Sequence, residues 1–275
     1  MRIAIKLQPL SYPAAIPATH HQLQAFIYET VEAVNPALAQ AVHDHGWAEP
    51  GSNKRFKFFV FSVPEAPRGF RFQDDDKVFD AGTVFWQIAS PRTEFITSLI
   101  AGLAVQPSLR IGRTQFAVEE VRVIPPPTFT SEMRLIALSP LVASTAQRRA
   151  DGRLVKSYLR DEQAFATAVG NNLLQKYQVL CGGLPAQTTP AQTTAEAAIE
   201  FAFDQEYLQR AGGFDSRKVT RMISFVTTRA DGLPERIQIR GIQAPFIVRG
   251  NPALIQTGWE CGFGEANSQG FGMAG

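Results

Sequence analysis

The sequence predicts an α+β fold of two tandem ferredoxin-like domains, each with the element order β-α-β-β-α-β. Residues 1–124 contain strand and helix patterns in that order. The triple proline at 125–127 can continue neither a helix nor a strand, because proline lacks the backbone N–H and fixes φ. After these prolines a second series of strand and helix patterns begins. We therefore expect one domain at 1–127 and a second at 128–275.

The first domain opens with a strand and a helical region. Residues 1–9 alternate apolar and polar side chains, which is typical of a half-buried strand. Residues 20–34 carry apolar side chains at helical spacing. Asn35 is a good N-cap and Pro36 suits the first position of a helix. A second, short helix should therefore begin at this Asn-Pro pair.

Strand alternation and helical spacing of the apolar residues also predict the remaining elements. In the first domain we expect strands at 57–63, 83–90 and 114–124, a turn-rich segment between the first two of them, and a helix at 91–105. In the second domain we expect a strand at 133–143, a helix at 161–180, a loop at 182–195, strands at 196–204, 219–228 and 236–250, and a short helix at 251–260.

Composition excludes several classes of protein. With 275 residues, of which 45% are hydrophobic, the chain can bury a substantial core, so global disorder is excluded. No apolar run approaches the roughly 18–20 residues of a membrane span, and the start is too quickly polar for a signal peptide. Cys181 and Cys261 give neither a disulfide framework nor a metal-binding spacing. We expect a cytoplasmic protein in a reducing compartment.

Positive charge is concentrated in two segments. Residues 210–249 hold eight basic residues against three acidic ones, although the whole chain carries a net charge of only +2. Residues 148–160 hold five basic residues and one acid. Such segments suit a phosphate backbone, and they also suit a solvated surface of strands and loops.

The end of the sequence, residues 261–275, reads CGFGEANSQGFGMAG. It contains two Gly-Phe-Gly triplets, at 262–264 and 270–272. Glycines allow positive φ, and successive N–H groups in such a segment can bind an anion. No Gly-Lys-Ser/Thr follows, so the segment is not a Walker A loop. Spacing alone leaves two interpretations: a phosphate-binding loop, or a tight connection that packs Phe263 and Phe271 inward.

Together with GNPALIQTGWE before it, this tail resembles the glycine-rich signature of the RAMP superfamily. More narrowly, the chain resembles the CRISPR endoribonucleases that process precursor crRNA, the family numbered six among the CRISPR-associated proteins. MRIAIKLQP, LQAFIYETV, NPALAQAVHDHG and KFFVFS resemble that family's first domain, in the right order. Residues at about 125–200 are generic. Members usually continue into another strand after the last glycines, whereas this sequence ends at Gly275.

The resemblance implies two ferredoxin-like domains side by side and metal-independent cleavage of a CRISPR repeat RNA. The ribose 2′-OH would attack the adjacent phosphate, which leaves a cyclic phosphate and a free 5′-OH. Such a reaction needs a base, an acid and a cation near the phosphate. We expect no cofactor and no metal, and the four histidines, at 20, 21, 43 and 45, lack partner cysteines at zinc spacing. His20 and His21 are interpreted as residues at a helix start.

Three positions match the family's catalytic pattern: Tyr28, His43 and Lys57. On one continuous helix, the 15 residues between Tyr28 and His43 would separate them by roughly 22 Å, too far to share a phosphate. A break at Asn35-Pro36 would let the second helix fold back on the first. We expect His43 to protonate the leaving oxygen, Tyr28 to take or orient the 2′-OH proton, and Lys57 to stabilise the phosphorane. His45 is the rival of His43, since only one of the two can face Tyr28.

RNA is the expected partner. The resemblance implies RNA contacts by the tail glycines, and the basic segments add candidates for phosphate contacts; the full set is Gly262, Gly264, Gly270, Gly272, Arg148, Arg149, Arg217, Lys218, Arg221 and Arg240. Further subunits of a CRISPR effector and a homodimer are additional candidate partners, whereas a membrane is not expected. The main alternative is a non-catalytic RAMP scaffold that holds guide RNA, which has no need of Tyr28, His43 and Lys57. An unrelated ferredoxin-like metabolic enzyme is disfavoured by the absence of a cofactor motif.

Overall fold

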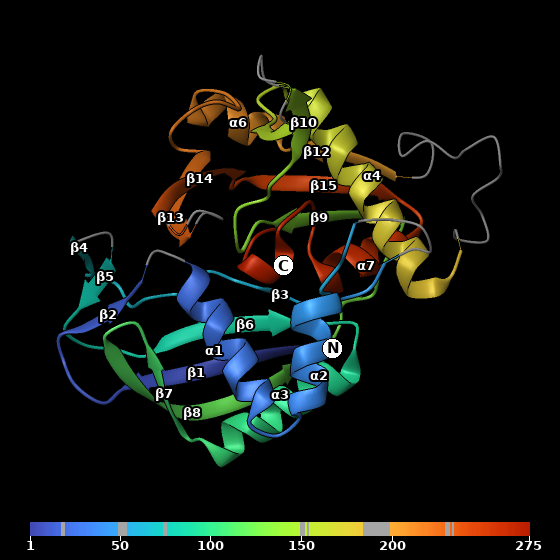
Figure 1. Cartoon of the computed structure of the whole chain (residues 1–275). Coiled ribbons are helices and arrows are strands. Elements are labelled where there is room, and N and C mark those ends of the chain that lie inside the picture. The colour runs from blue at the N-terminus through green and yellow to red at the C-terminus, as the bar shows by residue number, and fades with distance from the viewer. Residues whose placement is uncertain are drawn as a thin grey trace. The chain divides into compact units, whose positions relative to one another are not determined.

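The computed structural model describes residues 1–17, 20–48, 54–73, 76–148, 152, 154–183, 199–228, 232 and 234–275. The chain is a mixed helix and strand protein, and its residues gather into two compact units (Figure 1). The first unit comprises Met1–Pro127 with Ser268–Gly270, and the second comprises Thr128–Asn267 with Phe271–Gly275. Within the described ranges, no helix is long and apolar enough to cross a membrane.

A five-stranded antiparallel sheet forms the centre of the first unit. Its strands lie in the order β3 (Val60–Phe61), β6 (Val84–Ala89), β1 (Arg2–Pro9), β8 (Thr114–Ile124) and β7 (Ser108–Ile111). The alternate residues Ile3, Ile5 and Leu7 of β1 are fully buried, which confirms the alternation seen in the sequence. The strands predicted at 83–90 and 114–124 are confirmed as well.

The strand predicted at 57–63 is confirmed only in part. The regular strand β3 comprises only Val60 and Phe61, although Ser62 N also donates to Gln87 O of β6 at 2.9 Å. Phe58 has a positive φ of 50°, outside the extended region, so the backbone before β3 cannot continue the strand. The side chains of Phe59 and Phe61 are nevertheless fully buried.

Two helices cover one face of this sheet (Figure 1). They are α1 (His20–Glu32) and α3 (Thr93–Val105), and both were predicted. Leu23, Ile27 and Val31 of α1 belong to the same buried cluster as the core residues of α3 and β1. Gly102 of α3 faces the backbone of Thr30, where a Cβ atom would clash, and so glycine permits the two helices to approach closely.

A small antiparallel sheet in the first unit was not predicted. It consists of β2 (Ala14–Ile16), β5 (Asp76–Phe79) and β4 (Arg71–Gln73). All three residues of β4 are exposed, so this strand contributes no side chain to a buried core. The sequence predicts a turn-rich segment here, because a three-residue strand is too short to establish a period.

The second unit contains a three-stranded antiparallel sheet with two helices. Its strands lie in the order β12 (Ile199–Phe203), β15 (Pro245–Gly250) and β9 (Glu132–Ile136). The helices are α4 (Glu162–Cys181) and α7 (Pro252–Cys261), and both confirm predictions. Asp161 caps α4 by accepting from Ala164 N at 2.8 Å, and Asn251 caps α7 by accepting from Ala253 N at 2.9 Å. The seven-residue helix α6 (Gln205–Ala211) was not predicted.

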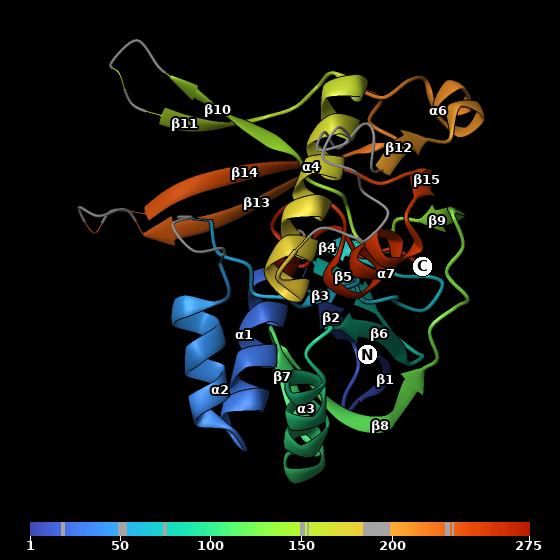
Figure 2. The same cartoon turned by 90° about the vertical axis from the view of Figure 1, so that its right-hand side faces the viewer.

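Two hairpins extend from the second unit (Figure 2). One joins β10 (Ser144–Arg148) to β11 (Leu154–Tyr158), and the other joins β13 (Thr220–Thr228) to β14 (Pro234–Ile242). The first was not predicted, because its residues were interpreted only as a basic segment. The stretch predicted as one strand at 236–250 is two strands, β14 and β15, separated at Gln243 and Ala244.

The last residues of the chain pair with β9. Ile136 N donates to Gly275 O at 2.8 Å, Gly275 N donates to Ile136 O at 3.0 Å, and Leu138 N donates to Met273 O at 2.8 Å. A short 3₁₀ turn, η3 (Asn267–Gln269), precedes this pairing. The glycine-rich tail therefore contributes backbone hydrogen bonds to the sheet of the second unit.

Candidate active site

The helical region after β2 folds back on itself at Asn35 and Pro36. Helix α1 ends at Glu32, and α2 (Pro36–Gln40) begins four residues later. Asn35 accepts a hydrogen bond from Leu38 N at 3.2 Å, and Pro36 lies in the first turn, where its missing N–H is not needed. Helix α2 continues into a π turn, η1 (Ala41–His45). The predicted break is confirmed, and we refer to α1, α2 and η1 together as the helical hairpin.

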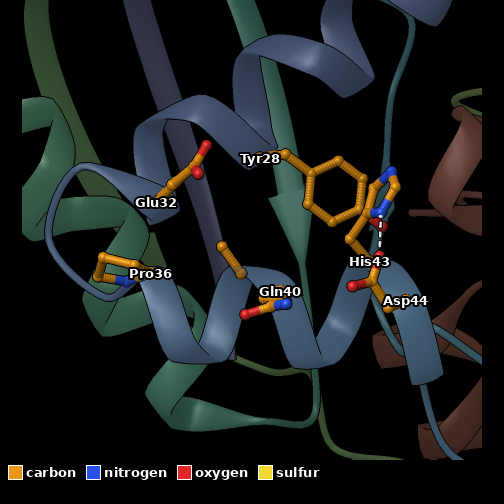
Figure 3. A pocket seen from close by; sticks show the side chains of 7 residues that line it. Tyr28, Glu32, Pro36, Gln40, His43 and Asp44 are labelled. Carbon is orange, nitrogen blue, oxygen red and sulfur yellow. Dashed lines mark hydrogen bonds and ion pairs between the residues drawn. The ribbon is translucent and has the colours of Figure 1, made fainter.

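This hairpin brings Tyr28 and His43 together. Their ring centroids lie 5.2 Å apart with an interplanar angle of 80°, an edge-to-face contact. Phe59 supports the tyrosine from another side, with its ring centroid 5.5 Å away. Figure 3 shows the two rings facing each other across the hairpin, Tyr28 from α1 and His43 from η1. The separation expected for a straight helix therefore does not arise.

The hydroxyl group of Tyr28 is buried. Among the residues that the structure describes, its oxygen has no hydrogen-bond partner. Burial raises the pKa of this phenol above its ordinary value. A general base would need the opposite change, so the structure gives no support to a tyrosinate that takes the 2′-OH proton.

His43 presents its imidazole at the surface, with 67% of the side chain exposed. Its Nδ1 atom lies 2.8 Å from Oδ1 of Asp44, the next residue along the chain. This contact holds the pKa of the Asp44 carboxyl below its ordinary value, because a hydrogen bond from the ring favours the ionised carboxylate. The Nε2 atom of His43 points away from Asp44 (Figure 3).

Lys57 is close to the same histidine. Its Nζ atom donates a hydrogen bond to the backbone carbonyl of His43. Partial burial lowers the pKa of this ammonium, while the charge of Asp44 opposes that decrease. All three residues of the family pattern, Tyr28, His43 and Lys57, are thus gathered at one place in the first unit.

A cavity of about 420 Å³ lies between α1 and α2 (Figure 3). Its lining includes Glu32 and Pro36 in one part, and Tyr28, Gln40, His43 and Asp44 in the other. His45 is exposed and is not part of this lining. The two histidines are two positions apart in the π turn and point to different sides of it. This placement favours His43 over His45 as the histidine that acts with Tyr28.

The remaining histidines are not gathered with these residues. His20 opens α1, as predicted, and is buried, which lowers its pKa to about 4. Its Nδ1 atom contacts Gln269 O at 3.2 Å, a residue grouped with the first unit. Across the described part of the chain, no three His, Cys, Asp or Glu side chains cluster as a metal site would.

The four tail glycines are buried within the protein. Gly264 has a φ of 71°, and a Cβ atom there would clash with the Val142 carbonyl. Gly272 has a φ of 80°, and a Cβ atom there would clash with the Phe263 carbonyl. Gly262 and Gly270 also have positive φ. Phe263 and Phe271 are 0% and 2% exposed, so the interpretation as a tight, inward-packed connection describes this segment.

A buried ammonium group fastens this tail to α4. Lys176 is 2% exposed, and its Nζ atom donates to Gly262 O at 2.6 Å and to Gly264 O at 2.8 Å. Two carbonyls of the first Gly-Phe-Gly triplet are therefore engaged by protein. Glu265, between the two triplets, accepts from Ser144 Oγ at 2.8 Å and pairs with Lys156 at 2.7 Å.

The basic candidates differ in exposure. Arg148, Arg217, Lys218 and Arg221 are exposed, whereas Arg149 lies outside the described residues. Arg240 corrects the prediction, because 5% of its side chain is exposed. Its guanidinium donates to Leu159 O at 2.7 Å and to Asp215 Oδ1 at 2.6 Å. An arginine enclosed by these partners stabilises the second unit and is not available to a phosphate.

Two family models match the chain. The model described as CRISPR-associated protein Cas6, N-terminal, matches residues 15–122. The model described as CRISPR associated protein Cas6, C-terminal, matches residues 124–275, more than half of the sequence. The chain belongs to the Cas6 family.

Individual relatives agree with this membership. The chain is 28% identical over 274 residues to the protein named CRISPR-associated endoribonuclease Cas6 1 of Methanocaldococcus jannaschii, and the alignment covers 99% of this chain and 91% of the relative. A solved structure described as CRISPR associated protein Cas6 is 27% identical, with a TM-score of 0.69 and coverage of 100% and 98%. A second, described as an RAMP protein binding different RNA substrates, has a TM-score of 0.76 with 20% identity, at coverage of 100% and 98%, and shows the same fold.

Two groups of residues in this Cas6 chain were not predicted from the sequence. Asp44 and Gln40 line the cavity beside His43, but neither was singled out. The burial of Lys176 has no signal in the sequence, because a lysine in an amphipathic helix normally lies at the surface. The signal for Asp44 was present in the sequence, since an acid directly follows the candidate histidine.

Proposed function

We propose that this endoribonuclease cleaves CRISPR repeat RNA within precursor crRNA without a metal ion. The observation that carries the proposal is the contact between the Tyr28 and His43 rings in the helical hairpin. Relatives named CRISPR-associated endoribonuclease Cas6 supply the class of reaction. The hairpin supplies an exposed imidazole, a cationic side chain and a cavity at one place.

The bond changes of the proposed step are those of a transesterification. The ribose 2′ oxygen bonds to the adjacent phosphorus, and the bond from phosphorus to the 5′ oxygen breaks. His43 donates the proton on Nε2 to the departing 5′ oxygen, because imidazole is the side chain that ordinarily exchanges protons near neutral pH. The proton of the 2′-OH passes to water. The products are a cyclic phosphate and a 5′-OH.

Tyr28 and Lys57 have supporting parts in this step. Tyr28 keeps its proton, since burial raises its pKa, and its ring holds the imidazole in place. Because its hydroxyl oxygen is buried, Tyr28 acts in this proposal through its ring and does not exchange a proton with the 2′-OH. Lys57 uses one N–H on the His43 carbonyl, and its remaining donors would stabilise negative charge on the phosphorane.

Both units fit the ferredoxin-like layout, with the catalytic residues in the first domain, 1–127. In the first unit the sheet order β8-β1-β6-β3, with α1 after β1 and α3 after β6, matches the order 4-1-3-2 of that fold. In the second unit, β12, β15 and β9 are followed in the sheet by Met273–Gly275, with α4 after β9 and α7 after β15, and we propose 128–275 as the second domain. The β13–β14 hairpin is then an insertion between the second and third strands.

RNA contacts are assigned to the exposed basic residues of the second domain. Arg148, Arg217, Lys218 and Arg221 remain in the set, and Arg240 is left out. Burial leaves the tail glycines an indirect part, which is to fix the fold of the loop that carries them. We place the protein in the cytoplasm, which suits its two free cysteines. Other effector subunits and a second copy of the chain stay candidate partners.

The test is cleavage of labelled repeat RNA by the purified chain in excess EDTA. We expect one fixed cut, with a 2′,3′-cyclic phosphate on the upstream fragment and a 5′-OH on the downstream one. End groups are read by phosphatase and kinase treatment followed by electrophoresis. RNA binding with no cleavage would instead identify the chain as a guide-holding scaffold. Cleavage that EDTA abolishes would overturn the metal-independent reaction.

A further inference from the structure

The contact between His43 and Asp44 decides which ring nitrogen carries a proton. An ionised carboxylate can only accept hydrogen bonds, so the Nδ1 atom at 2.8 Å must be the donor. The lowered pKa of Asp44 keeps this carboxylate ionised, and the hydrogen bond from His43 is the largest cause of that decrease. The Nε2 atom is then the nitrogen left to meet the RNA.

Neighbouring side chains hold Asp44 in this position. Gln40 lies one helical turn earlier, and a hydrogen bond from its side chain also lowers the pKa of Asp44. Lys57 is near enough for its charge to interact with Asp44, and it fastens the backbone of His43. His45 is the other titratable group whose charge reaches this carboxylate. The Asp44 carboxylate is therefore held beside the His43 ring by several neighbouring polar and charged side chains.

We propose that Asp44 is a positioning residue for RNA cleavage, whose carboxylate fixes the Nδ1–H form of His43 and turns Nε2 toward the scissile phosphate. This inference rests on the proposed function. In the doubly protonated ring, Asp44 accepts from Nδ1–H while Nε2–H faces the leaving 5′ oxygen. When the bond from phosphorus to that oxygen breaks, the Nε2 proton moves to it. The neutral ring that remains keeps Nδ1–H on Asp44, so the same hydrogen bond serves before and after the transfer.

A purely structural part for Asp44 makes different predictions. An acid within the π turn could simply contribute to the local hydrogen bonding of η1. Its removal would then lower thermal stability without changing the protonation pattern of the His43 ring. The two cases are separated by a readout on the imidazole itself.

The experiment compares Asp44→Ala and Asp44→Glu with the wild-type chain. Single-turnover cleavage is measured with protein in excess, RNA affinity by filter binding, and the His43 tautomer by ¹⁵N NMR of the neutral ring. For Asp44→Ala we expect cleavage to fall by about tenfold to a hundredfold with affinity unchanged. The proton on the neutral ring should move from Nδ1 to Nε2. Asp44→Glu keeps a carboxylate and should retain more of the rate than Asp44→Ala.

Glu29→Gln is the matched control, because it removes an exposed carboxylate from α1 that does not line the cavity. It should cleave at the wild-type rate. A fully active Asp44→Ala variant, or one whose His43 proton stays on Nδ1, would overturn the positioning role while the proposed function stands. A wild-type chain that cuts no repeat RNA would overturn both. A tautomer shift without a loss of rate would also overturn the positioning role, because the Nδ1–H form would then not matter for cleavage.

Discussion

The helical hairpin of the first unit and the glycine-rich tail were both interpreted from the sequence as parts of an RNA site, but their structures differ. In the hairpin, the reactive side chain is exposed: two-thirds of His43 is open to solvent beside a cavity. In the tail, all four glycines are buried and backbone groups are engaged by protein. The helical hairpin exposes a reactive side chain, whereas the glycine-rich tail determines the backbone conformation of a buried loop.

This difference shows what a sequence motif can encode. An exposed histidine held against a half-buried tyrosine across a helix break is not required by the packing of the core, so this contact indicates function. Glycines at positive φ, with no room for a Cβ atom, are explained by packing alone. The likeness of the tail to a family signature therefore indicates a shared fold of the loop before it indicates a shared contact with RNA.

The most direct test of this difference is to remove the imidazole of His43. His43→Ala should lower the single-turnover cleavage rate by about a thousandfold, because general acid catalysis is worth roughly 10² to 10⁴ in rate. RNA affinity should be unchanged. His45→Ala is the control, since that side chain does not line the cavity, and it should cleave normally. If His43→Ala cuts at the wild-type rate while His45→Ala does not, the assignment within the hairpin is wrong.

Whether the buried tail requires glycine can be tested at Gly272. Gly272→Ala should lower the free energy of unfolding by about 3 kcal/mol or more, because positive φ and a clash with Phe263 O both oppose the new side chain. Denaturant titration followed by tryptophan fluorescence measures the change. Gly182→Ala shares the positive φ, 73°, but a Cβ atom there meets nothing within 4 Å. It should cost only about 1 kcal/mol. Equal effects at the two sites would count against the packing argument.

The smallest expected effect concerns the exposed basic residues. Replacing Arg217, Lys218 and Arg221 together by alanine should weaken RNA binding by about tenfold and reduce the slope of log K against log salt by roughly 2. The cleavage rate with saturating protein should be unaffected. Arg249→Ala is the control, because this half-buried arginine already pairs with Glu132 and Glu200. An unchanged salt slope in the triple variant would remove these residues from the RNA surface.

Local chemistry explains which parts of the fold were predictable. Asn35-Pro36 and Asn251-Pro252 predicted helix starts correctly, because capping depends on adjacent residues only. β4 was not predicted because three residues are too few to establish a period, and the β10–β11 hairpin because its residues were interpreted only as a basic segment. The environment of Arg240 could not be predicted, because its partners Leu159 and Asp215 are 81 and 25 residues away in the sequence and meet it only in the folded protein.

Only part of the candidate site could likewise be predicted from the sequence. Spacing and the helix break predicted that Tyr28 and His43 could meet, and the structure brings them to 5.2 Å. The nearness of Lys57 came from family likeness alone, because no periodic pattern relates it to the hairpin. The direction of the Tyr28 pKa shift depends on how deeply Phe59 and its neighbours enclose the ring. No property of the sequence around residue 28 indicates that depth.

The hydrogen bonds from Lys176 of α4 to the glycine-rich tail affect the order in which the chain folds during synthesis. Lys176 reaches carbonyls 86 and 88 residues further along, and Met273 N donates to Ser139 Oγ across 134 residues. Contacts so distant in sequence form slowly, because a long loop must close before they contribute. During synthesis the second unit must wait for its final residues to leave the ribosome, whereas every strand of the first unit's sheet is available once Ile124 has emerged. The five-stranded sheet of the first unit should therefore form before the sheet of the second unit is complete.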